Sequence, residues 1–185
     1  YAADLGLDKV IVYKIDFEGG KLEPSSEAVV KGGEGPRHFD FHRSGKFAYL
    51  INEMGNTFTA FTCDSETGRL EEIQIVSTLP KDFTETSYCA DVHVSADGKF
   101  LYGSNRGHDS IAICSIDQKT GELTSVDIES TVGKNPRNFG IDPTGSFLLA
   151  ANQESDTIVV FRIDPKTGAL DSTGHRFVSP TPVCI

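Results

Sequence analysis

The sequence lacks the features that mark membrane proteins and nucleic-acid-binding proteins. No stretch approaches the 18 or more apolar residues of a membrane span, and lysine and arginine form no cluster. Asp and Glu number 27 against 17 Lys and Arg, so the formal net charge is −10. Because proteins that bind the nucleic-acid backbone usually carry a basic stripe, we predict neither a nucleic-acid nor a membrane partner. A local group of arginines could still bind a small anionic substrate.

Cysteine is sparse and shows no metal-binding spacing. The four cysteines include no Cys-x-x-Cys pair, and no histidine stands at a zinc-finger spacing from them. This pattern predicts neither a disulfide scaffold nor a structural zinc site. We expect all four thiols to be reduced: Cys63, Cys89, Cys114 and Cys184.

Methionine is nearly absent, since Met54 is the only one and the chain opens on Tyr1. We therefore expect the chain to be a piece of a longer protein. No signal peptide is visible, which leaves the cytoplasm as the expected location. With 38% apolar residues and 12 Phe, the chain has enough apolar surface for a sizeable core. It is expected to form a single domain over residues 1–185.

A repeat runs through the whole chain. Four reference positions carry Asp or Asn and stand 48, 53 and 47 residues apart: Asp4, Asn52, Asn105 and Asn152. After each of them, Asp or Asn, Asp, Gly and Leu recur at the same offsets without a gap; in the second copy these are Asn56, Asp64, Gly68 and Leu70. The repeat predicts four copies of one unit, with approximate boundaries at 1–34, 35–86, 87–134 and 135–185.

Each copy contains short runs rich in Val, Ile, Phe, Tyr and Thr, separated by turn residues, and none shows helical apolar periodicity. In the second copy the runs are residues 39–42, 47–51, 58–63 and 70–78. A repeated four-stranded unit of this length is typical of a β-propeller blade. We therefore predict an all-β protein, a β-propeller of four-stranded antiparallel blades, with about four blades present.

The two ends of the chain are complementary in this pattern. The first copy begins directly with the second strand of a blade, whereas residues 182–185 fall where the first strand of a following blade would start. A ring closed by its two ends would place that last strand beside the first copy.

Candidate site residues follow from the geometry of a blade. Its first two strands are innermost and antiparallel, so the start of the first strand and the end of the second lie on one face beside the axis. Polar residues at these positions would converge on the mouth of the central channel, where a ligand pocket is expected. The copies differ there, and Arg37, Glu53 and Arg106 form a cation, anion, cation set on one rim.

This set permits definite chemistry. Two guanidinium groups offer bidentate donors to a phosphate or carboxylate and can stabilise a developing oxyanion. A carboxylate between them could orient or deprotonate a water molecule. The alternative is an ion-pair network that only ties the blades together.

A second base would help, and histidine is the usual one. His38 follows Arg37, and neighbours in an extended strand point in opposite directions. Only one of the two can therefore face the channel unless the strand bulges, and we favour Arg37. Each histidine has a packed or solvated structural role as its alternative. Together with the catalytic set, we predict these substrate-binding residues: His38, Asp91, His93, His108 and Arg137.

Several segments now resemble a known family. They are Gly35-Pro36-Arg37-His38, Tyr49 to Glu53, Ala90 to Ser95, Ser104 to Ile111 and Asn135 to Phe139. They look like signature segments of the seven-bladed propeller lactonases, which group bacterial 6-phosphogluconolactonases with fungal carboxymuconate cyclases. The similarity covers the whole chain, and Ser-Asn-Arg-Gly-His-Asp-Ser is its most specific part.

The resemblance implies a cytosolic β-propeller without metal or cofactor, which opens or forms a lactone of an anionic sugar acid or dicarboxylate. The family's catalytic cluster of His, Arg, Glu and Arg would place Arg37, Glu53 and Arg106 in this chain, with its His in an earlier blade before Tyr1. The chain departs from the family in length, with four blades in place of seven, so we expect a fragment of a longer lactonase.

Three functions are therefore compared. The first is hydrolysis of 6-phosphogluconolactone to 6-phosphogluconate, a step of the pentose phosphate pathway, which makes a small anionic lactone or carboxylate the expected partner. The second is a carboxy-cis,cis-muconate cyclase-type reaction, which forms a lactone. The third is a non-catalytic propeller that binds a partner through its rim. The sequence does not indicate an oligomeric state.

Overall fold

A computed structural model describes all residues of the chain, 1–185. It contains fifteen β-strands and one short 3-10 turn, and it has no α-helix. No helix in it is long and apolar enough to cross a membrane. The all-β prediction is confirmed.

The strands form four separate sheets. The first has three strands and each of the others has four. The first sheet comprises β1 (Ala2–Asp4), β2 (Lys9–Asp16) and β3 (Lys21–Val29). The second comprises β4 (Pro36–Phe41), β5 (Phe47–Asn52), β6 (Thr57–Cys63) and β7 (Leu70–Ser77). The third comprises β8 (Tyr88–Val94), β9 (Phe100–Arg106), β10 (Ser110–Ile116) and β11 (Leu123–Ser130). The fourth comprises β12 (Pro136–Ile141), β13 (Phe147–Asn152), β14 (Thr157–Ile163) and β15 (Leu170–Val178), with the 3-10 turn at Gln153–Ser155.

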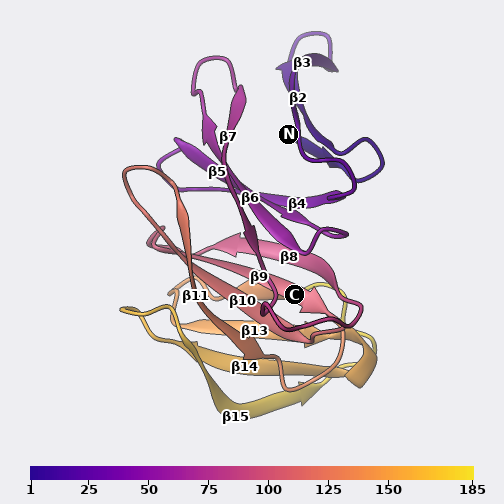
Figure 1. Ribbon diagram of the computed structural model, residues 1–185, viewed down its shortest axis with the longest axis vertical. Coiled ribbons are helices and arrows are strands. Elements are labelled where there is room, and N and C mark those ends of the chain that lie inside the picture. The colour runs from indigo at the N-terminus through magenta and orange to yellow at the C-terminus, as the bar shows by residue number, and fades with distance from the viewer.

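Each sheet is an antiparallel meander whose strands pair in chain order. The sheets follow one another along the long axis of the molecule, from β1–β3 at the top of Figure 1 to β12–β15 at the bottom. The first strands of the last three sheets are neighbours, because β8 contacts both β4 and β12. This is the arrangement of propeller blades around an axis, as the repeat predicted.

The chain does not close into a four-bladed ring. The first and last sheets lie at opposite ends of the arc in Figure 1. Residues 179–185 form no strand, and the Ile185 N–H donates to Asn138 Oδ1 at 2.8 Å in the fourth sheet. The last residues therefore do not add a strand to the first sheet in this structure.

Hydrophobic cores lie between neighbouring sheets. The largest has 12 buried residues and joins the second and third sheets, with Tyr49 and Phe58 facing Leu101. A cluster of 11 joins the third and fourth sheets, and a cluster of 7 joins the first and second. Burying each Phe, Leu or Ile contributes about 1.5–3 kcal/mol, so blade stacking holds the arc together.

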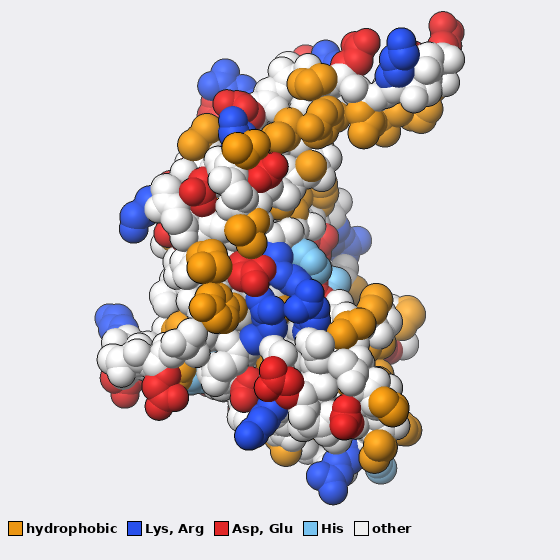
Figure 2. Space-filling view, turned by 90° about the vertical axis from the view of Figure 1, so that its right-hand side faces the viewer, with side chains coloured by type: hydrophobic (Ala, Val, Ile, Leu, Met, Phe, Trp, Pro, Cys, Tyr) orange, Lys and Arg blue, Asp and Glu red, His pale blue; other side chains and the backbone are white.

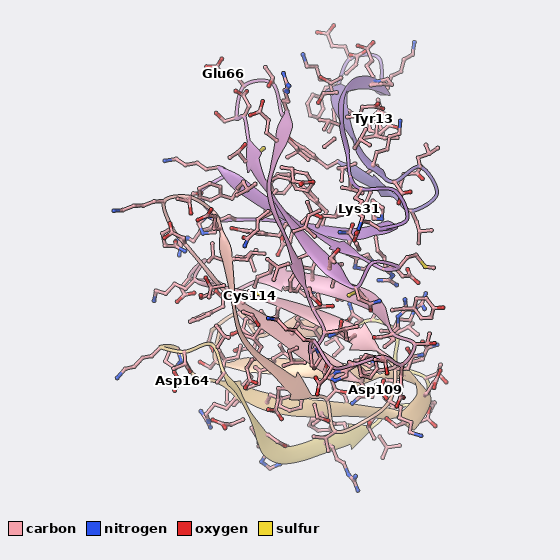
Figure 3. The ribbon with its side chains drawn as sticks, in the orientation of Figure 1. Tyr13, Lys31, Glu66, Asp109, Cys114 and Asp164 are labelled. Carbon is pink, nitrogen blue, oxygen red and sulfur yellow. The ribbon has the colours of Figure 1, made fainter.

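The meander gives every blade two distinct ends. We call one the site face: it carries the starts of β4, β8 and β12 and the turns after β5, β9 and β13. We call the other the far face: it carries the turns at residues 64–69, 117–122 and 164–169. Figure 3 shows Asp109, in a site-face turn, on the right of the molecule and Asp164, in a far-face turn, on the left.

The far face is linked from blade to blade by one repeated hydrogen bond, which we call the tyrosine latch. A tyrosine three residues before the reference Asp or Asn of one blade donates to a glycine carbonyl in the far-face turn of the next. The pairs are Tyr1 to Gly68 at 2.9 Å, Tyr49 to Gly121 at 3.1 Å and Tyr102 to Gly168 at 2.9 Å.

The reference asparagines Asn105 and Asn152 have a structural role. Asn105 Nδ2 donates to Thr78 O at 3.0 Å, and Asn152 Nδ2 donates to Thr131 O at 3.1 Å. Each bond ties a blade to the segment that enters it. All four cysteines are free thiols, as predicted.

Candidate functional site at the start of the innermost strands

Each innermost strand of a four-stranded sheet bulges where it enters the sheet. The pairing register shifts between Pro36 and His38 in β4, between Cys89 and Val92 in β8, and between Pro136 and Asn138 in β12. In a bulge, two residues of one strand lie opposite a single residue of the partner strand. The regular alternation of side chains between the two faces of the sheet is interrupted there.

The bulge in β4 corrects the prediction that only one of Arg37 and His38 faces the channel. That prediction holds for a regular strand, and this strand is irregular at Arg37. Both side chains reach the same site, and Arg37 Nη1 donates to His38 Nε2 at 3.1 Å.

Arg37, Glu53 and Arg106 meet as the repeat predicted. Arg37 Nε lies 3.0 Å from Glu53 Oε2, and Arg106 Nη2 lies 2.6 Å from Glu53 Oε1. The side chains are 14% exposed for each arginine and 22% for the glutamate. Both oxygens of Glu53 are thus engaged by guanidinium groups in a largely dry setting, where charge-assisted bonds are strong.

Backbone carbonyls at the start of β8 hold the two guanidinium groups in place. Arg37 Nη1 donates to Ala90 O, and Arg106 Nη2 donates to Cys89 O at 2.9 Å. Arg106 Nε is buried without a hydrogen-bond partner. The cluster therefore keeps an unused donor at a fixed arginine.

Arg137 adds a third cation. Burial lowers the pKa of Arg37, and repulsion from Arg106 and Arg137 lowers it further, against the attraction of Glu53 and Asp91. Arg137 itself forms no hydrogen bond or ion pair through its side chain. Figure 2 looks onto the site face and shows Lys and Arg side chains gathered at its centre beside His side chains. Arg37, Arg106 and Arg137 thus gather close to one another, although the chain as a whole has a net charge of −10.

Asp91 forms a second cluster directly beside the first. It is 3% exposed and accepts from three side chains on three strands: His38 Nδ1 at 2.7 Å, His93 Nε2 at 3.1 Å and Asn138 Nδ2 at 2.5 Å. Burial alone would raise the pKa of Asp91, but the bonds from His38 and His93 outweigh it and hold that pKa well below its usual range. Asp91 is therefore an ionised, buried hub.

A cavity of about 350 Å³ opens against the Asp91 cluster and Arg37. Arg37 and His38 line it from β4, and Asp91 and His93 line it from β8. A space of this size suits a small ligand.

The structure does not bring His108 into these clusters. Its Nδ1 bonds Ser110 Oγ at 2.7 Å, and its ring lies edge-on to Phe83 at 4.7 Å between centroids. The prediction that His108 binds substrate has no support from this placement.

Asn138 is the site residue that we did not predict. It stands one residue after Arg137, as His38 stands one residue after Arg37, so aligning the two Pro-Arg segments makes it the counterpart of His38, and both residues bond Asp91 in the structure. No group of three or more His, Cys, Asp or Glu residues is placed to hold a metal ion.

Comparisons with known proteins agree with this architecture. Residues 1–185 match the family described as "Lactonase, 7-bladed beta-propeller". The chain is 44% identical over 143 residues to a 6-phosphogluconolactonase of Bacillus subtilis, covering 77% of this chain and 40% of that protein. It is 42% identical over 150 residues to a 6-phosphogluconolactonase of Formosa agariphila, covering 78% of this chain and 41% of that protein.

A solved structure gives the same result. The periplasmic gluconolactonase of Pseudomonas aeruginosa superposes with a TM-score of 0.92 at 35% identity, covering 98% of this chain and 51% of that one. The chain thus spans about half the length of this structure and two fifths of the two curated relatives.

Proposed function

Because this chain belongs to the seven-bladed β-propeller lactonase family, we propose that it hydrolyses the lactone of an anionic sugar acid at the cluster of Arg37, Glu53 and Arg106. We take 6-phosphogluconolactone as the first substrate, since two relatives of more than 40% identity are 6-phosphogluconolactonases. A cytoplasmic location stays a prediction, because one solved relative is periplasmic.

The observation that carries the proposal is the group of guanidinium groups on the site face: Arg106 and Arg137 are close enough to Arg37 to repel it, and Glu53 pairs with Arg37 and Arg106. A phosphorylated lactone brings a phosphate and, in the transition state, a second negative charge on the former carbonyl oxygen. Arg37 and Arg106 are held by Glu53 and by backbone carbonyls, so their remaining donors are fixed before substrate arrives. Preorganised donors of this kind are the main source of oxyanion stabilisation.

Glu53 would act chiefly by holding the two arginines. Each of its oxygens is already paired with a guanidinium group at 3.0 Å or less. In this role it fixes the spacing of the arginines and orients water at the edge of the pocket.

The test uses the protein as encoded, with any residues that flank 1–185 in its reading frame. We expect it to hydrolyse 6-phosphogluconolactone, with Arg106→Ala lowering kcat/KM by about 10²- to 10³-fold, the usual effect of removing one oxyanion donor. Glu53→Gln should lower kcat/KM as well, because the amide pairs weakly with two guanidinium groups. His175→Gln, on an exposed position of β15, is the control.

Unchanged hydrolysis in both site variants would show that the cluster is only structural. A panel with unphosphorylated gluconolactone measures how much the phosphate contributes to KM. Assaying lactone formation from a carboxylated muconate distinguishes a cyclase from a hydrolase. Failure of every lactone to react or to shift the melting temperature, together with a co-purifying protein, would favour the binding module.

A further inference from the structure

The clusters raise the question of which group accepts a proton from water. Glu53 is the only carboxylate between the arginines, and both of its oxygens are in ion pairs. It cannot take a proton without weakening one of the bonds that fixes the oxyanion donors. The proton acceptor is therefore expected elsewhere on the cavity wall.

His38 has the geometry of such an acceptor. Its Nδ1 lies 2.7 Å from Asp91 Oδ1, and its side chain is 44% exposed on the cavity. Ionised Asp91 can only accept a hydrogen bond, so Nδ1 carries the hydrogen. Nε2 is then left with its lone pair, which accepts from Arg37 Nη1 at 3.1 Å.

Asp91 is well suited to fix that tautomer. Its backbone N–H bonds Ser104 Oγ at 3.0 Å, and Asn138 and the Val92 N–H hold its oxygens from two sides. A buried carboxylate that orients an imidazole through Nδ1 leaves Nε2 directed at the reacting atoms, as in acid–base pairs of hydrolases generally.

His93 differs from His38 although both contact Asp91. His93 reaches Asp91 through Nε2, and its ring packs edge-on against Phe139 at 4.8 Å between centroids. Its Nε2 is therefore turned to the carboxylate, and only His38 presents Nε2 to the arginines.

We propose that His38 is the acid–base residue of lactone hydrolysis in this chain and that Asp91 is its positioning residue. The proposal rests on the proposed function and adds to the Arg37, Glu53 and Arg106 cluster. In the first step, the water oxygen bonds to the lactone carbonyl carbon while His38 Nε2 takes the water proton. In the second step, the ring C–O bond breaks and His38 returns that proton to the leaving alkoxide, giving a hydroxy acid.

Arg37 couples substrate binding to this base. In the structure, an N–H of Arg37 Nη1 occupies the lone pair of His38 Nε2. When an anionic oxygen of the substrate takes that N–H, Nε2 is released to accept a proton from water. In the free protein, His38 Nε2 therefore stays bonded to Arg37 until an anionic ligand binds.

The pH dependence of His38 is set by the charged and titratable groups on the elements around it. Those groups are Arg37 and Asp40 on β4, Asp91 and His93 on β8, Glu53 after β5 and Tyr1 before β1.

The first arm of the test compares two amide variants in the protein as encoded. His38→Gln keeps an acceptor near Arg37, and His38→Asn keeps a donor near Asp91. We expect both to lower kcat for 6-phosphogluconolactone by about 100-fold or more, the usual size of acid–base catalysis, with KM changing only a few-fold. The wild-type rate should fall toward acidic pH, because a protonated imidazole cannot accept a proton, and this fall should vanish in both variants. His175→Gln should retain the wild-type rate and pH profile.

The second arm needs no turnover. Imidazole nitrogen NMR of the free protein should show His38 neutral with its hydrogen on Nδ1 at pH 8, and Asp91→Asn should abolish that preference. Adding 6-phosphogluconate should shift the His38 Nε2 signal as Arg37 is withdrawn. A hydrogen on Nε2 would overturn the proposal.

The outcomes separate this proposal from the proposed function. An active wild type with an equally active His38→Gln overturns the role of His38 and leaves the lactonase assignment intact. A wild type inactive on every lactone overturns both. A loss of kcat in the His38 variants, together with an Nδ1 hydrogen on His38 in the wild type, supports both.

Discussion

In the far-face turns, equivalent positions of successive blades hold the same glycine, whereas the starts of the innermost strands on the site face hold different residues. Gly68, Gly121 and Gly168 all accept a latch tyrosine. Fifteen residues before the reference asparagines, by contrast, stand Arg37, Ala90 and Arg137, and one residue later stand His38, Asp91 and Asn138. The backbone is the same at both faces, but the side-chain chemistry does not repeat at the starts of the innermost strands on the site face.

The two faces also differ in whether their hydrogen-bond donors have partners within the protein. Each latch hydroxyl on the far face has a partner within the protein. On the site face, Arg106 Nε is buried without a partner. Because buried donors are normally paired, this unpaired donor distinguishes the face at which we propose that a ligand binds.

Substitution on the far face should therefore affect stability and leave catalysis of the folded protein unchanged. The largest effect is expected for Gly121→Ala. Gly121 has φ +76°, and a Cβ there would meet the Phe47 ring at 2.5 Å. Left-handed strain and overpacking together should lower the free energy of unfolding by about 3 kcal/mol, measured by urea denaturation.

Gly20→Ala is the matched control, because Gly20 is the same repeat position in the first sheet. It has φ +63° and nothing within 4 Å of a built Cβ. Only the backbone strain of about 1 kcal/mol applies there. Equal losses at the two glycines would show that packing against Phe47 is unimportant.

On the site face the reverse result is expected, with binding affected and stability preserved. Arg137→Ala should raise KM for an anionic lactone about tenfold, the loss of one charge-assisted hydrogen bond, while Tm stays constant. Arg137→Lys keeps the charge, so its KM should lie between those of the wild type and the alanine variant. A drop in Tm with unchanged KM would assign Arg137 to the structure.

The tyrosine latch allows a smaller change on the far face. Tyr102→Phe removes only the hydroxyl that bonds Gly168 O at 2.9 Å. We expect a loss of about 1 kcal/mol of unfolding free energy, the usual net value of one hydrogen bond. Tyr13, labelled on β2 in Figure 3, provides the control Tyr13→Phe, since its hydroxyl forms no hydrogen bond within the protein. Equal stability of the two variants would contradict the latch.

The regular part of this comparison could be predicted from the sequence. The recurrence of Asp, Gly and Leu at fixed offsets defines the turns, and the apolar runs between them define the strands. The same alignment placed Arg37, Glu53 and Arg106 on one face, because each follows from a position in the repeat. These three residues do meet in the structure.

The irregular part could not be predicted. The bulge at Arg37 depends on how β4 pairs with β5, and no residue in Gly-Pro-Arg-His specifies that register. Asp91 is a hub only because β4, β8 and β12 lie side by side, which brings together residues 53 and 47 positions apart in the chain. His108 shares its motif with Arg106, but the turn directs it to Ser110.

The smallest expected effect concerns pH at the Asp91 hub. Burial opposes a charge on His93, but its bond to Asp91 and the charges of Asp91 and Asp40 outweigh burial and raise the pKa of His93. A raised folded-state pKa adds stability below the unfolded value, about 6.5, and that stability is lost as pH rises through the folded value. Asp91 stays ionised over this range, because its own pKa is lowered.

His93→Gln should therefore destabilise the protein more at pH 5.5 than at pH 9. The His93 side chain is 39% exposed, so the difference should be a few tenths of a kcal/mol and at most about 1 kcal/mol, as for solvent-screened ion pairs. Urea midpoints of the wild type and His93→Gln at both pH values measure it, with His175→Gln as the control. A greater loss at pH 9 would mean that His93 is neutral when it bonds Asp91. The hydrogen bonds from His38 and Asn138 would then stabilise the charge of Asp91 instead.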